Sequence, residues 1–115
     1  MNVAVKNSEV TVNISEDLIR ERAFARIAEI FNVATPLLRK DAKFGVDLKA
    51  SFVSDFRHNE FDKVDQDIHD VANQTIAAEL SKGVVTIRTV EEYCNYMVRC
   101  YEAKPDDVKK ILRLL

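Results

Sequence analysis

Apolar residues recur at three- and four-residue spacing in three long segments of the chain, with charged and amide residues between them. The first segment is about 16–31, the second is about 60–80, and the third begins after Thr89. A shorter amphipathic segment follows Pro105. This spacing is typical of helices that bury one face, so the pattern predicts a helix over each of the four segments.

Residues that cap helices stand at the predicted ends. Ser15 precedes an acidic first turn and suits an N-cap, while Asn13 and Glu16 have the spacing of an alternative capping box. Thr89 suits the N-cap of the third helix, and Gly83 suits the C-cap of the second. The caps therefore favour helix ends close to those that the apolar spacing predicts.

The connection between the first and second predicted helices is long. Pro36 cannot continue the first helix, and Gly45 suits a bend. The connection carries more large apolar residues than a freely solvated loop would: Leu37, Leu38, Phe44, Val46 and Leu48. We therefore expect it to pack across the helices.

Composition favours one helical domain. The chain has 115 residues, the usual size of a single domain, and only two glycines and two prolines. Long irregular loops are disfavoured by that composition, whereas helices are favoured. We predict an all-α fold class and a single domain over 1–115.

Charge and hydropathy exclude several function classes. The net charge of −2 does not provide the clustered excess of lysine and arginine that nucleic acid binding requires. No apolar run is long enough for a membrane span, and the N-terminus has neither a secretory nor an organelle-targeting pattern. We expect a cytoplasmic protein, with the mitochondrial matrix as the alternative.

No motif indicates catalysis or metal binding. There is no glycine-rich phosphate loop, and no nucleophile and base can be paired from their spacing. His58 and His69 have no companion at ligand spacing, so we interpret both as exposed polar residues. Cys94 and Cys100 lie off a common helix face and are interpreted as reduced core or boundary thiols. We therefore expect no enzyme, no catalytic residue and no metal site.

Two short motifs resemble the acyl carrier protein family. Residues 50–65 read ASFVSDFRHNEFDKVD, where that family has the form Ala-Ser-Phe-x-x-Asp-Leu-Gly-x-Asp-Ser-Leu-Asp-x-Val-Glu. The family's last helix opens with Ile-x-Thr-Val and continues to a Tyr, and here IRTV at 87–90 is followed by CNYM at 94–97. The resemblance covers about 16–101.

The resemblance implies an acyl-carrier-protein-like bundle of three or four helices with a long first connection. The domain would have its core at about 16–101, a lead-in at 1–14 and a C-terminal extension at 102–115 that holds a short extra helix. Family members serve fatty acid or polyketide biosynthesis. They carry their substrate on a phosphopantetheine arm attached to the serine that opens the second helix.

The position of that serine is held by Glu60, which cannot form the phosphodiester. The Gly and Asp that shape the serine's turn in the family fall on Arg57 and Asn59. The resemblance in this register implies a degenerate attachment site and no cofactor. An alternative register aligns 44–48 with Phe-x-x-Asp-Leu and makes Ser51 the attachment site of a functional acyl or aminoacyl carrier with 4'-phosphopantetheine. That register requires an insertion within the second helix, which rotates its apolar stripe, so we favour Glu60.

A run of acidic residues surrounds this position. In the family this surface docks basic partners, which include carrier-dependent enzymes and, in mitochondria, small helical proteins of the LYR type. The alternative interpretation is a solvated helix face. The resemblance assigns the docking role here to Asp55, Glu60, Asp62, Asp65 and Asp67, with Asp70 continuing the run. The predicted function is a non-enzymatic docking module for a basic helical partner. The second alternative is a helical interaction or regulatory protein unrelated to carriers.

Overall fold

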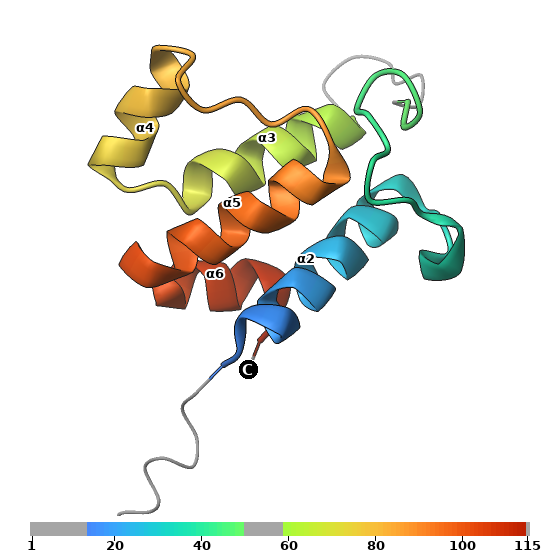
Figure 1. The fold of residues 1–115 in the computed structure, drawn as a ribbon, viewed down its shortest axis with the longest axis horizontal. Helices are drawn as coiled ribbons and strands as arrows, with labels where there is room; N and C mark the ends of the chain where they lie inside the picture. The colour runs from blue at the N-terminus through green and yellow to red at the C-terminus, as the bar shows by residue number, and fades with distance from the viewer. Residues whose placement is uncertain (1–13, 50–58, 115) are drawn as a thin grey trace, which may run out of the picture.

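A computed structural model describes residues 14–49 and 59–114. The described residues form helices and turns, with two isolated bridges and no strand among them, which confirms the all-α fold class for these ranges (Figure 1). The elements in chain order are α2 (Glu16–Phe31), a 3₁₀ turn η1 (Thr35–Leu37), α3 (Glu60–Asp70), α4 (Gln74–Ser81), α5 (Val90–Ala103) and α6 (Pro105–Leu112). No helix in the described ranges is long and apolar enough to cross a membrane.

Helices α2 and α5 form the centre of the fold, with α3 packed against α2 and α6 folded back against both α2 and α5 (Figure 1). These four helices supply most of the buried apolar side chains. The core includes Ile19, Ala23, Ile27, Val64, Ile68, Tyr93, Met97, Cys100, Val108 and Leu112. Helix α4 buries Ile76 alone among its residues and lies to one side of the others.

The ends of α2 and α5 agree with their capping residues. The Ser15 side chain accepts a hydrogen bond from the Leu18 N–H at 3.0 Å, whereas Asn13 lies outside the described residues. Thr89 and Glu92 form a reciprocal capping box at the start of α5. Each cap satisfies N–H groups that the first turn of a helix leaves without a partner. The predicted helices at 16–31 and after Thr89 are confirmed.

The single helix predicted over 60–80 is wrong, because the chain breaks it into α3 and α4. Asn73 is extended, with φ −84° and ψ −178°, and its side chain accepts a hydrogen bond from the Ile76 N–H at 2.8 Å. That cap begins a new helix in a new direction. Val71 lies at the break and is fully buried. The apolar spacing therefore continues across the break and conceals it.

The long connection packs against the start of α5, as expected. The backbone oxygens of Ala42 and Lys40 accept hydrogen bonds from the N–H groups of Val90 and Glu91 at 3.1 and 2.9 Å. Leu38 and Leu48 are buried and Gly45 makes a bend with φ +86°. In contrast to the prediction, Leu37 and Val46 are 76% and 62% exposed. The connection is therefore packed on one side and leaves apolar side chains in solvent on the other.

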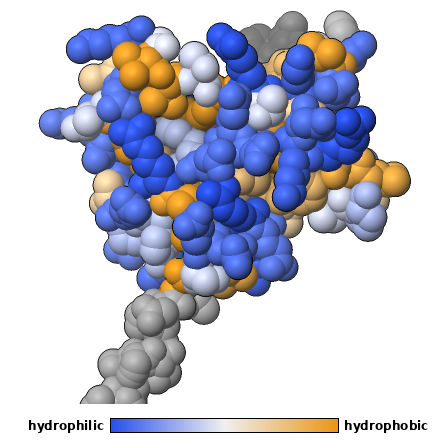
Figure 2. Space-filling model, in the orientation of Figure 1, coloured by the Kyte–Doolittle hydropathy of each residue, from blue (hydrophilic) through white to orange (hydrophobic). Residues whose placement is uncertain are grey.

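Polar residues cover most of the face seen in Figure 2, and its hydrophobic patches are separate from one another. Beneath the surface, Cys94 and Cys100 are buried free thiols, which confirms their interpretation as reduced core residues. Burial raises the pKa of the Cys94 thiol from 9.0 to about 11. Neither cysteine is therefore an activated thiolate at neutral pH.

Candidate docking site at the start of helix α3

Helix α3 begins with a complete capping box. The Asn59 side chain accepts a hydrogen bond from the Asp62 N–H at 2.9 Å, and the Asp62 carboxylate accepts one from the Asn59 N–H at 3.1 Å. Glu60 is the first residue of the helix. Acidic residues in a first turn are favoured by the helix dipole. The start of α3 is therefore stabilised by its own polar residues.

The outer face of α3 carries carboxylates over two turns. Asp62 and Asp65 are exposed, and Glu60 is partly exposed. Lys63 is also exposed and places a positive charge among them. His69 is exposed as expected, and its Nδ1 lies 3.5 Å from an oxygen of Asp65. An exposed pair of this kind contributes little stability.

Asp67 does not belong to this surface, and its assignment to the docking run is corrected. The residue is 4% exposed and lies on the inner face of α3 with Val64 and Ile68. Asp67 follows Val64 by three residues, and residues three apart on a helix lie on the same face. The count of acids along the sequence therefore included one that faces the interior.

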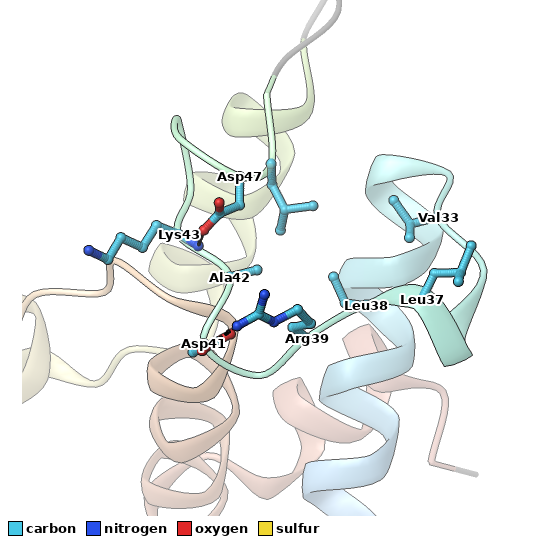
Figure 3. Close-up of a pocket in the computed structure, with 9 residues that line it drawn as sticks. Val33, Leu37, Leu38, Arg39, Asp41, Ala42, Lys43 and Asp47 are labelled. Carbon is cyan, nitrogen blue, oxygen red and sulfur yellow. Dashed lines mark hydrogen bonds and ion pairs between the residues drawn. The ribbon is translucent and has the colours of Figure 1, made fainter.

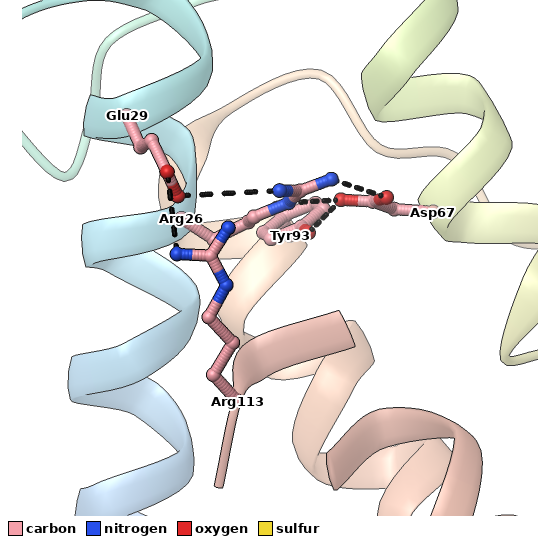
Figure 4. A network of polar contacts seen from close by, with 5 residues as sticks. All are labelled: Arg26, Glu29, Asp67, Tyr93 and Arg113. Carbon is pink, nitrogen blue, oxygen red and sulfur yellow. Dashed lines mark hydrogen bonds and ion pairs between the residues drawn. The ribbon is translucent and has the colours of Figure 1, made fainter. Parts of the chain in front are cut away.

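The Asp67 carboxylate holds three helices together (Figure 4). Arg26 of α2 donates to its two oxygens from Nε at 2.9 Å and from Nη2 at 3.0 Å. The hydroxyl of Tyr93 on α5 donates to the same carboxylate at 2.8 Å. Charge-assisted and bidentate hydrogen bonds are the strongest of their kind. They offset the free energy that burying a carboxylate costs.

Hydrogen bonding and burial shift the pKa values of two groups in this network. The hydrogen bond to Asp67 raises the pKa of the Arg26 guanidinium above its usual value. Burial, followed by the negative charge of Asp67, raises the pKa of Tyr93 well above its usual value. Glu29 extends the network to the end of α6, because it lies 4.0 Å from Arg26 and 3.4 Å from Arg113. Arg26 is therefore charged and Tyr93 is neutral at neutral pH.

A mainly apolar pocket of about 270 Å³ adjoins the acidic face. It lies between α3, the bend at Gly45 and the segment that leads into α5. Asp65 lines its rim, so the pocket and the carboxylates share one edge. Phe31 supports it from α2, with ring centroids 5.9 Å from those of both Phe44 and Phe61. The lining residues are Phe44, Gly45, Phe61, Val64, Asp65, Ile68 and Ile87.

Three of the predicted docking residues, Glu60, Asp62 and Asp65, lie in the first half of α3. Ser51 and Asp55 lie outside the described residues. Arg26 and Tyr93 were missed as polar partners because they are distant in sequence from Asp67. The only sequence signal was the position of Asp67 within the apolar stripe. Within the described ranges, no group of three or more His, Cys, Asp or Glu side chains is arranged to hold a metal ion.

No protein-family model matches the chain, and neither a curated protein nor a solved structure matches it. The resemblance of residues 50–65 and 87–97 to acyl carrier proteins therefore stays a prediction from those motifs. At the coarser level, the described residues are all-helical.

Proposed function

We propose that this chain is a divergent acyl-carrier-protein-like protein that docks a basic helical partner and acts without a phosphopantetheine arm. The observation that supports it is the start of α3, where Glu60, Asp62 and Asp65 follow the Asn59 cap within two helical turns. A glutamate carboxylate has no hydroxyl to form the phosphodiester of the arm. The carboxylates can therefore bind a basic partner, but Glu60 cannot hold the arm that carries a substrate.

The chemistry of the partner follows from the two neighbouring features of the site. Carboxylates on the outer face of α3 attract lysine and arginine side chains and accelerate encounter with a positively charged surface. The pocket beside Asp65 can receive an apolar side chain from the same partner. A helix that carries basic residues around one apolar anchor fits both features. The partner is either a carrier-dependent enzyme or a small basic helical protein.

Capture of partners from the native source tests this proposal. Purified full-length chain is immobilised as wild type and as Asp62→Lys with Asp65→Lys. A matched control reverses two exposed acids of α2, Asp17→Lys with Glu21→Lys, and so changes the net charge equally. We expect basic helical proteins to be retained by the wild type and the α2 control and lost by the α3 variant. An unchanged set of proteins on the α3 variant would favour the unrelated interaction or regulatory protein.

The second candidate is a functional acyl or aminoacyl carrier modified at Ser51. The apolar pocket beside α3 favours it, because such a pocket could shelter an apolar group attached nearby. Co-expression with a phosphopantetheinyl transferase and intact mass measurement decides between the two. We expect wild type and Ser51→Ala to have only their unmodified masses. A phosphopantetheine adduct on wild type that is absent from Ser51→Ala would establish the carrier instead.

A further inference from the structure

A recess opens beside the turn η1, on a different part of the surface from the acidic start of α3. We call it the η1 recess. It has a volume of about 390 Å³. In Figure 3, Val33, Leu37 and Leu38 stand on the α2 side, Asp47 stands opposite, and Arg39 lies with Asp41 along one edge. The residues that line it are Val33, Leu37, Leu38, Arg39, Asp41, Ala42, Lys43, Asp47 and Leu48.

The backbone holds Leu37 in solvent at the edge of this recess. Within η1, the Leu37 N–H donates to the Ala34 oxygen at 2.8 Å and the Leu38 N–H donates to the Thr35 oxygen at 3.1 Å. Leu38 occupies the inward position at 7% exposure, which leaves Leu37 76% exposed. Covering an exposed leucine side chain is favourable because it removes apolar surface from water. A partner that covered Leu37 would gain this stabilisation.

The segment 39–49, which supplies most of the lining of the recess, carries more cationic than acidic residues. The segment 39–49 has four cationic and two acidic residues in a chain whose net charge is −2. Both acids are engaged locally, because Asp41 pairs with Arg39 at 2.9 Å and Asp47 accepts a hydrogen bond from the Lys43 N–H at 2.9 Å. The cations that have no ion pair within the described part of the chain are Lys40, Lys43 and Lys49, all of them exposed.

We propose that the η1 recess binds an acidic amphipathic segment of a partner protein. One large apolar side chain of that segment packs against Leu37 inside the recess, and carboxylates on either side of it pair with Lys40, Lys43 and Lys49. Apolar anchors surrounded by complementary charge are the usual basis of helix-in-groove recognition. The site goes beyond the docking surface on α3 and selects for the opposite charge.

Two other occupants fit the recess less well. A second copy of the chain offers the exposed acids of α3, but the large exposed apolar residues of the described ranges are Leu37, Val46 and Val84, none of which is on α3. Among the described residues, α3 therefore offers no large exposed apolar anchor. An anionic membrane surface would satisfy the lysines but would not fill a concave recess. An acidic peptide supplies both the carboxylates and the anchor.

A designed peptide tests the proposal on the full-length chain. The probe is a fluorescein-labelled 14-residue peptide with leucine at alternating three- and four-residue spacing and glutamate or alanine elsewhere. Fluorescence anisotropy should show saturable binding to the wild type and at least tenfold weaker binding to Leu37→Asp. The matched control is Val84→Asp, which changes an apolar residue of similar exposure, 69%, away from the recess and should bind as wild type does. Circular dichroism spectra check that each variant is folded.

Charge is tested separately from the anchor. Lys40→Glu with Lys43→Glu should weaken binding of the peptide and remove most of its dependence on salt. Asp62→Lys with Asp65→Lys should leave peptide binding intact, so a failure of the α3 docking surface is distinguishable from a failure here. The proposal is overturned if wild type does not bind the peptide, or if Val84→Asp loses as much affinity as Leu37→Asp. Binding to phosphatidylglycerol vesicles in place of the peptide would overturn it as well, as would self-association that Leu37→Asp abolishes.

Discussion

Asp65 and Asp67 stand two residues apart on α3 and differ in almost every physical respect. Asp65 is exposed on the outer face of α3, and its neighbour His69 is exposed as well. Asp67 is buried on the inner face and accepts hydrogen bonds from Arg26 and Tyr93. A carboxylate in water contributes charge to encounter with partners, whereas a carboxylate in the interior contributes to stability only through its partners. The direction in which each side chain points from α3, outward for Asp65 and inward for Asp67, therefore decides its role.

The largest effect is expected from removing the inner carboxylate. Asp67→Ala leaves the Arg26 guanidinium with only its 4.0 Å contact to Glu29 and the Tyr93 hydroxyl without its acceptor. We expect the free energy of unfolding to fall by about 3 to 5 kcal/mol, the usual loss when one partner of a buried pair is removed. Urea denaturation followed by circular dichroism measures it. A loss no greater than that of an exposed substitution would contradict the structural role of Asp67.

A smaller loss is expected from Tyr93→Phe, which removes one hydrogen bond to the same carboxylate and keeps the ring in the core. Hydrogen bonds to charged groups contribute about 1.5 to 3 kcal/mol, so we expect a decrease in that range. A double-mutant cycle of Tyr93→Phe with Asp67→Ala should show strong coupling, because both changes break the same contact. Additive effects in that cycle would show that the two side chains act independently.

The free energy of unfolding should decrease at alkaline pH, because buried groups of the inner face have raised pKa values. Below pH 10, the Tyr93 hydroxyl is protonated in both the folded and unfolded states. Above it, the unfolded chain releases this proton while the folded chain, whose Tyr93 has a raised pKa, retains it. Stability therefore falls as pH rises from about 10. Cys94, with its pKa raised from 9.0 to about 11, adds a loss between these values.

Urea titrations at pH 8, 9, 10 and 10.5 check this dependence. Stability should decrease over the series, and Tyr93→Phe should make the decrease above pH 10 less steep because it has no hydroxyl to ionise. Cys94→Ala should flatten the part between pH 9 and 10. A curve that rises with pH in this window would have the wrong sign for groups whose folded pKa is raised.

The smallest effect on stability is expected on the outer face. Asp65→Asn removes an exposed charge whose contact with His69 is 3.5 Å long. Such substitutions usually change the free energy of unfolding by about 0.5 kcal/mol or less. The same variant should slow association with a basic partner and reduce the salt dependence of that rate. Stopped-flow fluorescence measures the rate, and a large loss of stability with no change in rate would reverse the assigned roles of Asp65 and Asp67.

The sequence predicted those parts of the fold in which local signals and packing agree. Helix α2 has the predicted ends because Ser15 caps one end and Asn32 adopts φ 56° at the other. The break between α3 and α4 could not be predicted from spacing, because Val71 keeps the apolar stripe continuous across it. Asn73 was the one available signal, since asparagine favours an N-cap over a helix interior.

The candidate site was predictable to the same limited extent. Glu60 follows the Asn59 cap and opens α3 at the predicted residue. The burial of Asp67 depends on Arg26, 41 residues away, and sequence spacing does not report such partners. The exposure of Leu37 depends on the hydrogen bonds of η1, which turn Leu38 inward instead. The burial of Asp67 and the exposure of Leu37 were not predicted because tertiary contacts decide which side of the chain faces water at both positions.

The central claim is that the acids at the start of α3 dock a basic partner. The most direct test is the affinity of a captured partner at low and high salt, measured by isothermal titration calorimetry. Wild type and Asp17→Lys with Glu21→Lys should bind tightly at low salt and lose affinity as salt rises. Asp62→Lys with Asp65→Lys should bind weakly at both salt concentrations. Equal affinity of this variant and the wild type, with the same response to salt, would contradict the claim.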